Sequence, residues 1–123
     1  MSSQRMQRVG DLLRQEISEI MRRRMKDPRL DFLTVTFVEV SSDLRYAKVY
    51  MSSPGTEEEL ADRLKVLAKA AGFIRSELFK RVTLKFIPEL SFRADRSIEH
   101  SVRISQVLRE LQDKARGGNV ESE

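Results

Sequence analysis

Residues 60–81 read LADRLKVLAKAAGFIRSELFKR and are the most informative segment for the fold. Leu60, Leu64 and Leu67 recur every three or four residues, which places them on one stripe of a helix. The apolar character continues beyond Gly72, although a glycine inside a helix costs about 1 kcal/mol relative to alanine. That cost predicts a reason for the glycine, either a kink or a close approach by another backbone. We therefore expect one long helix that is kinked at Gly72.

A β-hairpin is predicted before this helix. Polarity alternates with period two over residues 33–37 and again over 46–51, as in half-buried strands. Ser41-Ser42-Asp43 lies between them and favours a turn. The alternation slips at Phe37-Val38, which predicts a β-bulge. Thr56, followed three residues later by Glu59, has the spacing of a capping box, so the long helix should begin there.

The ends of the chain complete the order of elements. Residues 4–26 carry an apolar stripe at helical spacing, and Asp27-Pro28 ends that helix. A third strand is expected over residues 82–86, resuming at 90–92 beyond a proline that favours a sheet edge or a bulge. A last helix is expected from Ser97.

This order, helix, strand, strand, kinked helix, strand, helix, predicts an α+β fold: a three-stranded sheet with helices on one face. We expect a single domain over residues 1–116, because 123 residues suit one compact core. Gly117-Gly118 should stop the last helix, and residues 117–123 are expected to form a disordered tail.

Composition narrows the class of protein. The chain has no cysteine, which excludes disulfides and thiolate metal sites and fits a cytoplasmic setting. No apolar run is long enough for a membrane helix, and the first residues lack the hydrophobic stretch of a secretory signal, so we expect none. His100 is the only histidine, and no Walker, dinucleotide or glycine-flanked serine motif occurs. We expect no metal, no cofactor and no enzymatic activity.

The charge is distributed unevenly along the chain. Residues 1–30 carry eight basic and four acidic residues (+4), residues 31–68 four and seven (−3), residues 69–116 eleven and six (+5), and the tail −2, which together make the net charge of +4. If the two basic segments lie together in the fold, they form one positive face that suits RNA phosphates. Taken singly, each charge is more typical of a solvated surface. The candidate RNA-binding residues are Arg5, Arg8, Arg22, Arg23, Arg24, Lys26, Lys69, Arg75, Lys80 and Arg81.

Two other functions are compatible with the sequence. A protein-interaction adaptor is the main alternative, because Leu12, Met21 and Met25 lie off the main apolar stripe of the first helix. A hydrolase acting on RNA is the other, although no spacing of residues singles out a catalytic group. The phenylalanines Phe73, Phe79, Phe86 and Phe92 are expected in the core rather than as platforms for RNA bases.

Several motifs in fixed order resemble those of the ribosome-binding factor A family, nearly end to end. They are Asp27-Pro28-Arg29, Val38-Glu39-Val40-Ser41 with Asp43-Leu44, Ala47-Lys48-Val49-Tyr50, Ala70-Ala71-Gly72-Phe73-Ile74-Arg75, and Pro88-Glu89-Leu90 with Phe92, Asp95 and Ser97. The resemblance implies a KH-like fold of type II, in which a helix–kink–helix at Ala70, Ala71 and Gly72 replaces the usual Gly-x-x-Gly loop.

The resemblance also implies partners that composition and periodicity do not reveal. It implies binding to the small (30S) ribosomal subunit and its 16S ribosomal RNA. It further implies a role in late maturation of that RNA, including processing of its 5′ end, and release by an assembly GTPase. A monomer is the expected oligomeric state.

Overall fold

The structure is a computed structural model, and it describes residues 4–96. Its helices are α1 (Gln4–Arg24), the short 3-10 helix η1 (Pro28–Leu30), α2 (Glu57–Lys69) and α3 (Ala71–Arg81). Its strands are β1 (Thr34–Val40), β2 (Tyr46–Ser52) and β3 (Glu89–Ala94). The expected last helix and tail lie outside the described residues. The α+β order of the remaining elements is confirmed.

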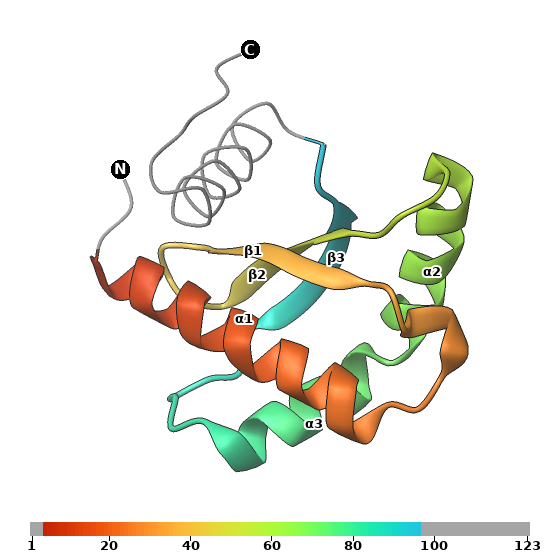
Figure 1. The fold of residues 1–123 in the computed structure, drawn as a ribbon. Helices are drawn as coiled ribbons and strands as arrows, with labels where there is room; N and C mark the ends of the chain where they lie inside the picture. The colour runs from red at the N-terminus through yellow and green to blue at the C-terminus, as the bar shows by residue number, and fades with distance from the viewer. Residues whose placement is uncertain (1–3, 97–123) are drawn as a thin grey trace, which may run out of the picture.

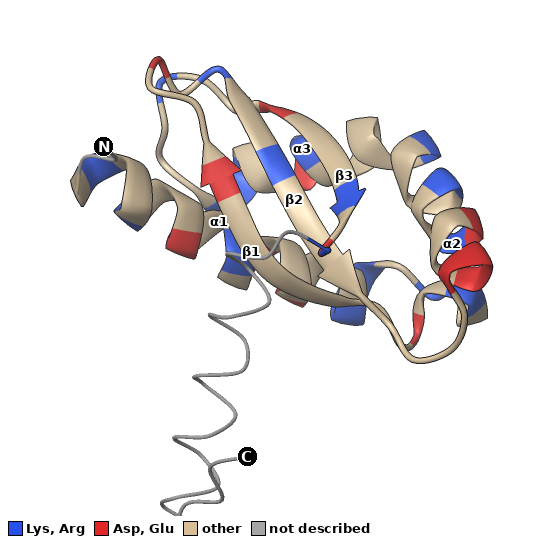
Figure 2. Ribbon diagram, turned by 90° about the horizontal axis from the view of Figure 1, so that it is seen from above, with Lys and Arg blue, Asp and Glu red and all other residues tan. Residues whose placement is uncertain are grey.

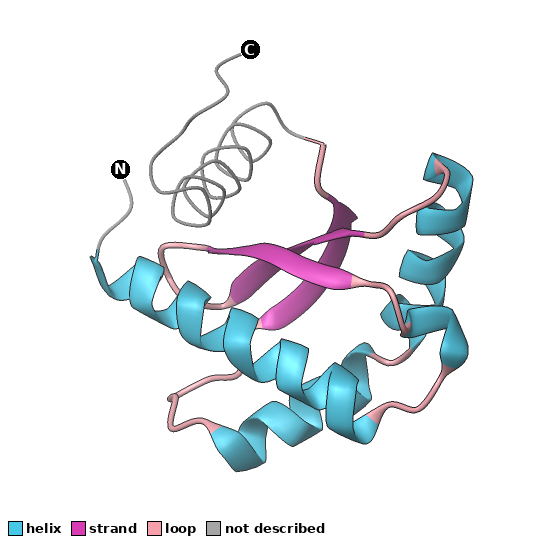
Figure 3. Ribbon diagram, viewed as in Figure 1, coloured by secondary structure: helices cyan, strands magenta, loops and turns pink. Residues whose placement is uncertain are grey.

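The three strands form one sheet in the order β1-β2-β3. β1 and β2 are antiparallel, whereas β3 runs parallel to β2. Helices α1 and α3 cover one face of this sheet, and α2 stands at one end of it (Figure 1). Figure 3 shows the same arrangement with the helices in cyan and the strands of the sheet in magenta. The predicted three-stranded sheet with helices on one side is therefore confirmed.

The core lies between this sheet face and the two helices beneath it. Leu13, Ile17 and Ile20 of α1 are inaccessible to solvent, as are Ile74 and Leu78 of α3. They meet the inward side chains of the strands, among them Val49 and Met51. The helical spacing of the α1 stripe therefore predicted its buried face correctly.

Helix α1 approaches the sheet most closely at Gly10. A Cβ atom at this position would lie 2.6 Å from the carbonyl oxygen of Val38 in β1. Real Cβ atoms do not approach that closely, so this mid-helix glycine is required by contact between two backbones. The sequence suggested a close approach of this kind as one explanation for Gly72, but the structure has it at Gly10.

The β-bulge lies one residue earlier than predicted. Val35 pairs with Met51 and Phe37 with Tyr50, so Thr36 is the extra residue on β1. The bulge changes the phase of the strand, which lets Val35, Val38 and Val40 all face the core. The Thr36 hydroxyl donates to the Tyr50 carbonyl at 3.1 Å and stabilises the irregularity.

The expected strand over residues 82–86 is wrong, because this segment is a loop. β2 pairs with β1 on one side and with β3 on the other, and residues 82–86 have no partner strand in the sheet. Pro88 is buried, and β3 begins directly after it. Alternating polarity alone could not reveal that lack of a partner strand.

The break in the long helix is confirmed, but it lies at Ala70 rather than Gly72. Helix α2 ends at Lys69 and α3 begins at Ala71, with Ala70 between them at φ −96° and ψ 7°. The capping box of Thr56 and Glu59 at the start of α2 is present. Gly72 lies in the first turn of α3, where a Cβ would meet nothing within 4 Å. No described helix is long and apolar enough to cross a membrane.

Candidate nucleic-acid interface

A groove of about 450 Å³ opens where the end of α1, η1 and the α2–α3 junction meet. We call it the basic groove, and its lining residues are Arg24, Met25, Lys26, Asp27, Arg29, Leu30, Val66, Lys69, Ala70 and Phe73. Four of these are cations and one is an acid, so the lining carries a formal charge of 4 − 1 = +3. The cations come from two segments at least 40 residues apart in the sequence. The fold therefore does bring parts of the two basic segments together.

The turn after α1 positions one wall of the basic groove. The Asp27 carboxylate caps η1 by accepting from the Arg29 backbone amide at 3.0 Å. It also accepts from the Arg29 side chain, through Nη2 at 2.7 Å and Nε at 3.0 Å. Leu30 is buried and anchors η1 to the core. Helix α1 already ends at Arg24, earlier than predicted, and the turn at Asp27-Pro28 places Arg29 on the same groove as Lys69.

The charges of this wall persist at neutral pH. The side-chain hydrogen bonds from Arg29 hold the pKa of Asp27 below its usual value, and the hydrogen bond from the Arg29 backbone amide lowers it further by a smaller amount. Asp27 therefore stays ionised and offsets part of the Arg29 charge. Lys26 and Lys69 are exposed and form no ion pair with another described residue. These two lysines are the cations of the groove most available to an anionic ligand.

A buried carboxylate joins the end of α1 to α3. The Glu77 side chain is only 8% exposed, and it lies 3.4 Å from both Arg24 Nε and Lys80 Nζ. Because a buried charge needs partners, these two cations are partly committed to the fold. Arg22 and Arg23 likewise both pair with Glu19, and Arg81 pairs with Glu16. Acids therefore offset much of the charge beside the basic groove.

Only three of the ten predicted cations, Arg24, Lys26 and Lys69, line the basic groove, and the other seven do not. Arg5 and Arg8 occupy the first two turns of α1, so Arg5 is roughly 28 Å from Arg24 at a helical rise of 1.5 Å per residue. The Arg75 guanidinium donates to the carbonyls of Ile87 at 2.8 Å and Pro88 at 3.1 Å, which ties α3 to the loop before β3. Figure 2 shows Lys and Arg, in blue, spread over helices, strands and loops rather than gathered on one continuous face.

Sequence reasoning missed two residues of the basic groove. Arg29 was noticed only within a motif, although its place directly after Asp27-Pro28 could have indicated a turn beside the basic helix end. Phe73 was expected in the core, yet it is 41% exposed and lines the groove. Phe79 and Phe86 are also exposed, at 75% and 46%, whereas Phe92 packs against the core. Three of these four expectations were therefore wrong, because several phenylalanines lie where the helices and the loop leave the core.

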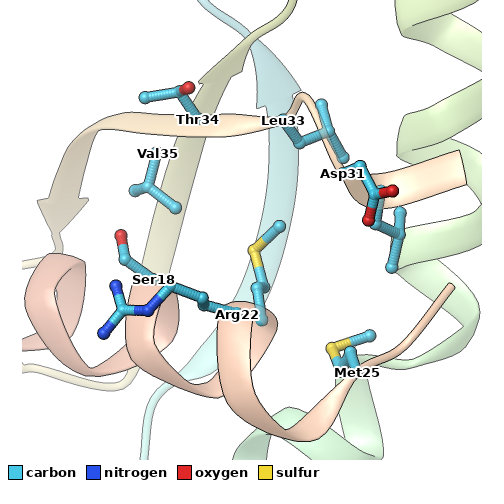
Figure 4. A pocket seen from close by; sticks show the side chains of 9 residues that line it. Ser18, Arg22, Met25, Asp31, Leu33, Thr34 and Val35 are labelled. Carbon is cyan, nitrogen blue, oxygen red and sulfur yellow. The ribbon is translucent and has the colours of Figure 1, made fainter. Parts of the chain in front are cut away.

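A second hollow, of about 310 Å³, lies between α1 and the edge strand β1. Figure 4 shows Ser18 and Arg22 of α1 on one side of the hollow and Val35 of β1, whose side chain points toward the helix, on the other. Its lining holds one cation and one acid, Arg22 and Asp31, so it lacks the positive charge of the basic groove, and it includes Met21 and Met25. This hollow suits a protein segment better than a phosphate chain, because flexible methionines adapt to varied side chains. No group of three potential metal ligands occurs among residues 4–96.

Comparison with known proteins identifies the family. The family model for ribosome-binding factor A matches residues 5–108. A ribosome-binding factor A of Desulfitobacterium hafniense is 46% identical over 122 residues, which cover 99% of this chain and 98% of the relative. This chain belongs to the ribosome-binding factor A family. The relative from Staphylococcus carnosus is 44% identical over 114 residues, covering 93% of this chain and 99% of that protein.

Solved ribosome-binding factor A structures share the fold. A solution structure from Thermotoga maritima matches with a TM-score of 0.70 at 36% identity, covering 80% of this chain and 94% of that one. The crystal structure from Thermus thermophilus matches with a TM-score of 0.66 at 29% identity, covering 73% and 96%. A homology model of the Thermus thermophilus ribosome-binding factor A, fitted into a cryo-EM map of its 30S complex, matches with a TM-score of 0.56 at 30% identity, covering 67% and 86%.

Removal of the Asp27 carboxylate, the partner of Arg29, raises the formal charge of the basic groove by one unit. We expect Asp27→Asn to strengthen binding to an RNA ligand about two- to fivefold at low salt, because Arg29 loses its carboxylate partner. Asparagine is a good N-cap, so η1 should keep its capping hydrogen bond. Titrations at low and high salt measure the effect, and the gain should shrink at high salt because screening weakens exposed charges. Weaker binding at both salt concentrations would contradict a role for the groove.

Proposed function

We propose that this member of the ribosome-binding factor A family binds the small ribosomal subunit through its 16S ribosomal RNA, using the basic groove, and has no catalytic role. The observation that carries the proposal is the convergence of Lys26, Arg29 and Lys69 on one groove. The relative fitted into a 30S complex supports the choice of the small subunit as partner.

The start of α3 adds to the anionic preference of the groove. No side chain caps this helix, whose first residues follow Ala70 directly. Uncapped amides at a helix N-terminus, together with the helix dipole, favour phosphate oxygens. Ala70 and Phe73 line the groove, so the helix start and the lysines face the same space. An RNA backbone fits these features without base-specific contacts, and the exposed ring of Phe73 offers a surface for one base.

The proposed cellular role follows from the family. We propose that the protein assists late maturation of 16S ribosomal RNA, including processing of the 5′ end, and that an assembly GTPase releases it. It acts as a cytoplasmic monomer. In this role the protein changes how the RNA is presented, and other enzymes cut it.

The salt dependence of binding tests the proposal. Purified protein should co-sediment with small subunits, and the affinity should fall with a log–log slope of roughly −3 if the four groove cations displace counterions from RNA. Protein-free 16S RNA should compete for the binding. Affinity that does not depend on salt, together with no competition by the RNA, would overturn the proposal.

A protein-interaction adaptor is the second candidate, and the hollow between α1 and β1 favours it. An extended segment of a ribosomal or assembly protein could pair with the edge of β1 while its side chains enter the hollow beside Met21 and Met25. Nuclease treatment separates the two functions. An adaptor keeps its partners after the RNA is digested, whereas an RNA-binding protein loses them.

Gly72 gives a further test at the helix junction. We expect Gly72→Leu to weaken binding to small subunits about tenfold, roughly 1.4 kcal/mol, because a side chain at the start of α3 holds the RNA backbone away from the amides. Thermal stability should not fall, because the position is open and leucine favours a helix more than glycine does. Sedimentation and thermal melting check the two expectations, and normal binding would show that Gly72 does not face the RNA.

A further inference from the structure

A second cationic surface lies at the end of α1 that is remote from the basic groove. It is formed where the start of α1, the β1–β2 turn and the loop before β3 meet, around a hollow of about 240 Å³. Arg5, Lys85 and Phe86 line this hollow, and Arg45 lies beside it. We call these four residues the second basic patch. Figure 2 shows Lys and Arg residues, in blue, at this end of the molecule as well as around the α2–α3 junction.

The patch is organised around an aromatic ring. The guanidinium carbon of Arg45 lies 5.0 Å from the centroid of the Phe86 ring, and Lys85 Nζ lies 5.7 Å from it. Both distances fall within the range of cation–π contact. Phe86 nevertheless remains 46% exposed. An exposed ring surrounded by cations is unusual as a device for stability, because burial of the ring would stabilise the fold more.

The loops that carry the patch are held in place by hydrogen bonds of their backbone, one of them to another backbone group and the others to side chains. The Glu89 amide donates to the Arg45 carbonyl at 2.8 Å, which joins the loop to the start of β2. The Arg75 guanidinium holds the carbonyls of Ile87 and Pro88, directly after Phe86. The Arg45 amide donates to Asp43 at 3.1 Å. The ring and the cations are therefore presented by a braced surface, which lowers the entropy that a ligand must overcome.

The charge of the patch favours an anionic partner. Arg5, Arg45 and Lys85 are exposed and none of them forms an ion pair with another described residue. Asp43 is the acid in the hollow, and its carboxylate already accepts from the Ser41 hydroxyl at 2.7 Å as well as from the Arg45 amide. The three cations and the Asp43 carboxylate together carry a formal charge of 3 − 1 = +2. An acidic ligand with a flat aromatic group satisfies both the cations and the ring.

We propose that the second basic patch holds a nucleotide of single-stranded RNA, with its base stacked against Phe86 and Arg45 and its phosphate against Arg5 and Lys85. Bases of single strands stack on aromatic rings and on arginine planes, and such stacking does not depend on the base. This inference rests on the proposed function and adds a second point of contact to it. The two contacts lie about one length of α1 apart, roughly 30 Å, so they would fix the orientation of the protein on its RNA.

A fluorescent reporter tests the stacking directly. The chain has no tryptophan, so Phe86→Trp introduces a single indole into the patch. The probe is a single-stranded adenosine 12-mer, and its binding to the full chain should quench that indole by base stacking. Phe79→Trp is the matched control, because Phe79 is exposed but lines neither the patch nor the basic groove. An indole at position 86 that is quenched no more than the one at 79 would overturn the inference.

Affinity measurements separate this inference from the proposed function. Phe86→Leu keeps an apolar side chain but removes the π face, and we expect it to weaken binding of the 12-mer at least about fivefold. Lys69→Glu reports on the basic groove with the same probe. If Lys69→Glu weakens binding and Phe86→Leu does not, the patch is not an RNA site but the proposed function stands. If the wild-type chain does not bind the RNA, both fail. If Phe86→Leu weakens association with whole subunits but not with RNA, the patch docks a protein instead.

Discussion

Reversal of the two unpaired lysines of the basic groove, Lys26→Glu with Lys69→Glu, is expected to weaken binding to small ribosomal subunits about 100-fold, or roughly 2.7 kcal/mol. Each substitution replaces attraction to phosphate with repulsion. Both side chains are exposed and lack ion pairs with other described residues, so the fold should survive. Co-sedimentation over a range of salt concentrations measures the loss, and the salt slope should become shallower.

The control changes the net charge by the same amount at a different place. Lys48→Glu with Arg93→Glu alters two exposed residues on the strands β2 and β3, away from the groove. If binding depends on the position of the cations, this variant should keep most of its affinity. Equal losses in the two double variants would show that only net charge matters, and the groove would lose its assigned role.

The largest expected effect on stability comes from adding one methyl group at Gly10. We expect Gly10→Ala to destabilise the protein by about 2–3 kcal/mol, because its Cβ would clash with the Val38 carbonyl oxygen and push α1 away from β1. On helix propensity alone, the same substitution would stabilise α1 by about 1 kcal/mol. The clash outweighs that gain, because neither partner is a flexible side chain. For a domain of this size, the melting temperature should fall by roughly 10–15 °C.

Gly72→Ala is the matched control for Gly10→Ala. Both glycines lie within helices, but a Cβ at position 72 meets nothing within 4 Å. We therefore expect the substitution at 72 to leave stability unchanged or to raise it by up to about 1 kcal/mol. Thermal or denaturant unfolding of the two variants compares them. The same sign of effect at both positions would contradict the close approach of α1 to β1.

Local patterns predicted most of the fold because the forces behind them are local. The stripe through Leu13 and Ile17 follows from helical spacing, and the capping box of Thr56 and Glu59 follows from hydrogen bonds three residues apart. The break near Gly72 was predicted for the same reason, although it lies at Ala70. The error over residues 82–86 has the opposite origin, because a strand exists only where another strand can pair with it.

Residue patterns alone predicted the order of the elements from α1 to α3, the buried stripe of α1 and the excess of basic residues in two segments. Only the tertiary structure decided which cations share a surface. It placed Lys26 and Lys69 in one groove, left Arg5 at the far end of α1, and committed Arg75 to two backbone carbonyls. The physical reason is range. Helices and turns arise from neighbours a few residues apart, whereas a charged surface depends on how distant segments pack and on which acids meet which bases.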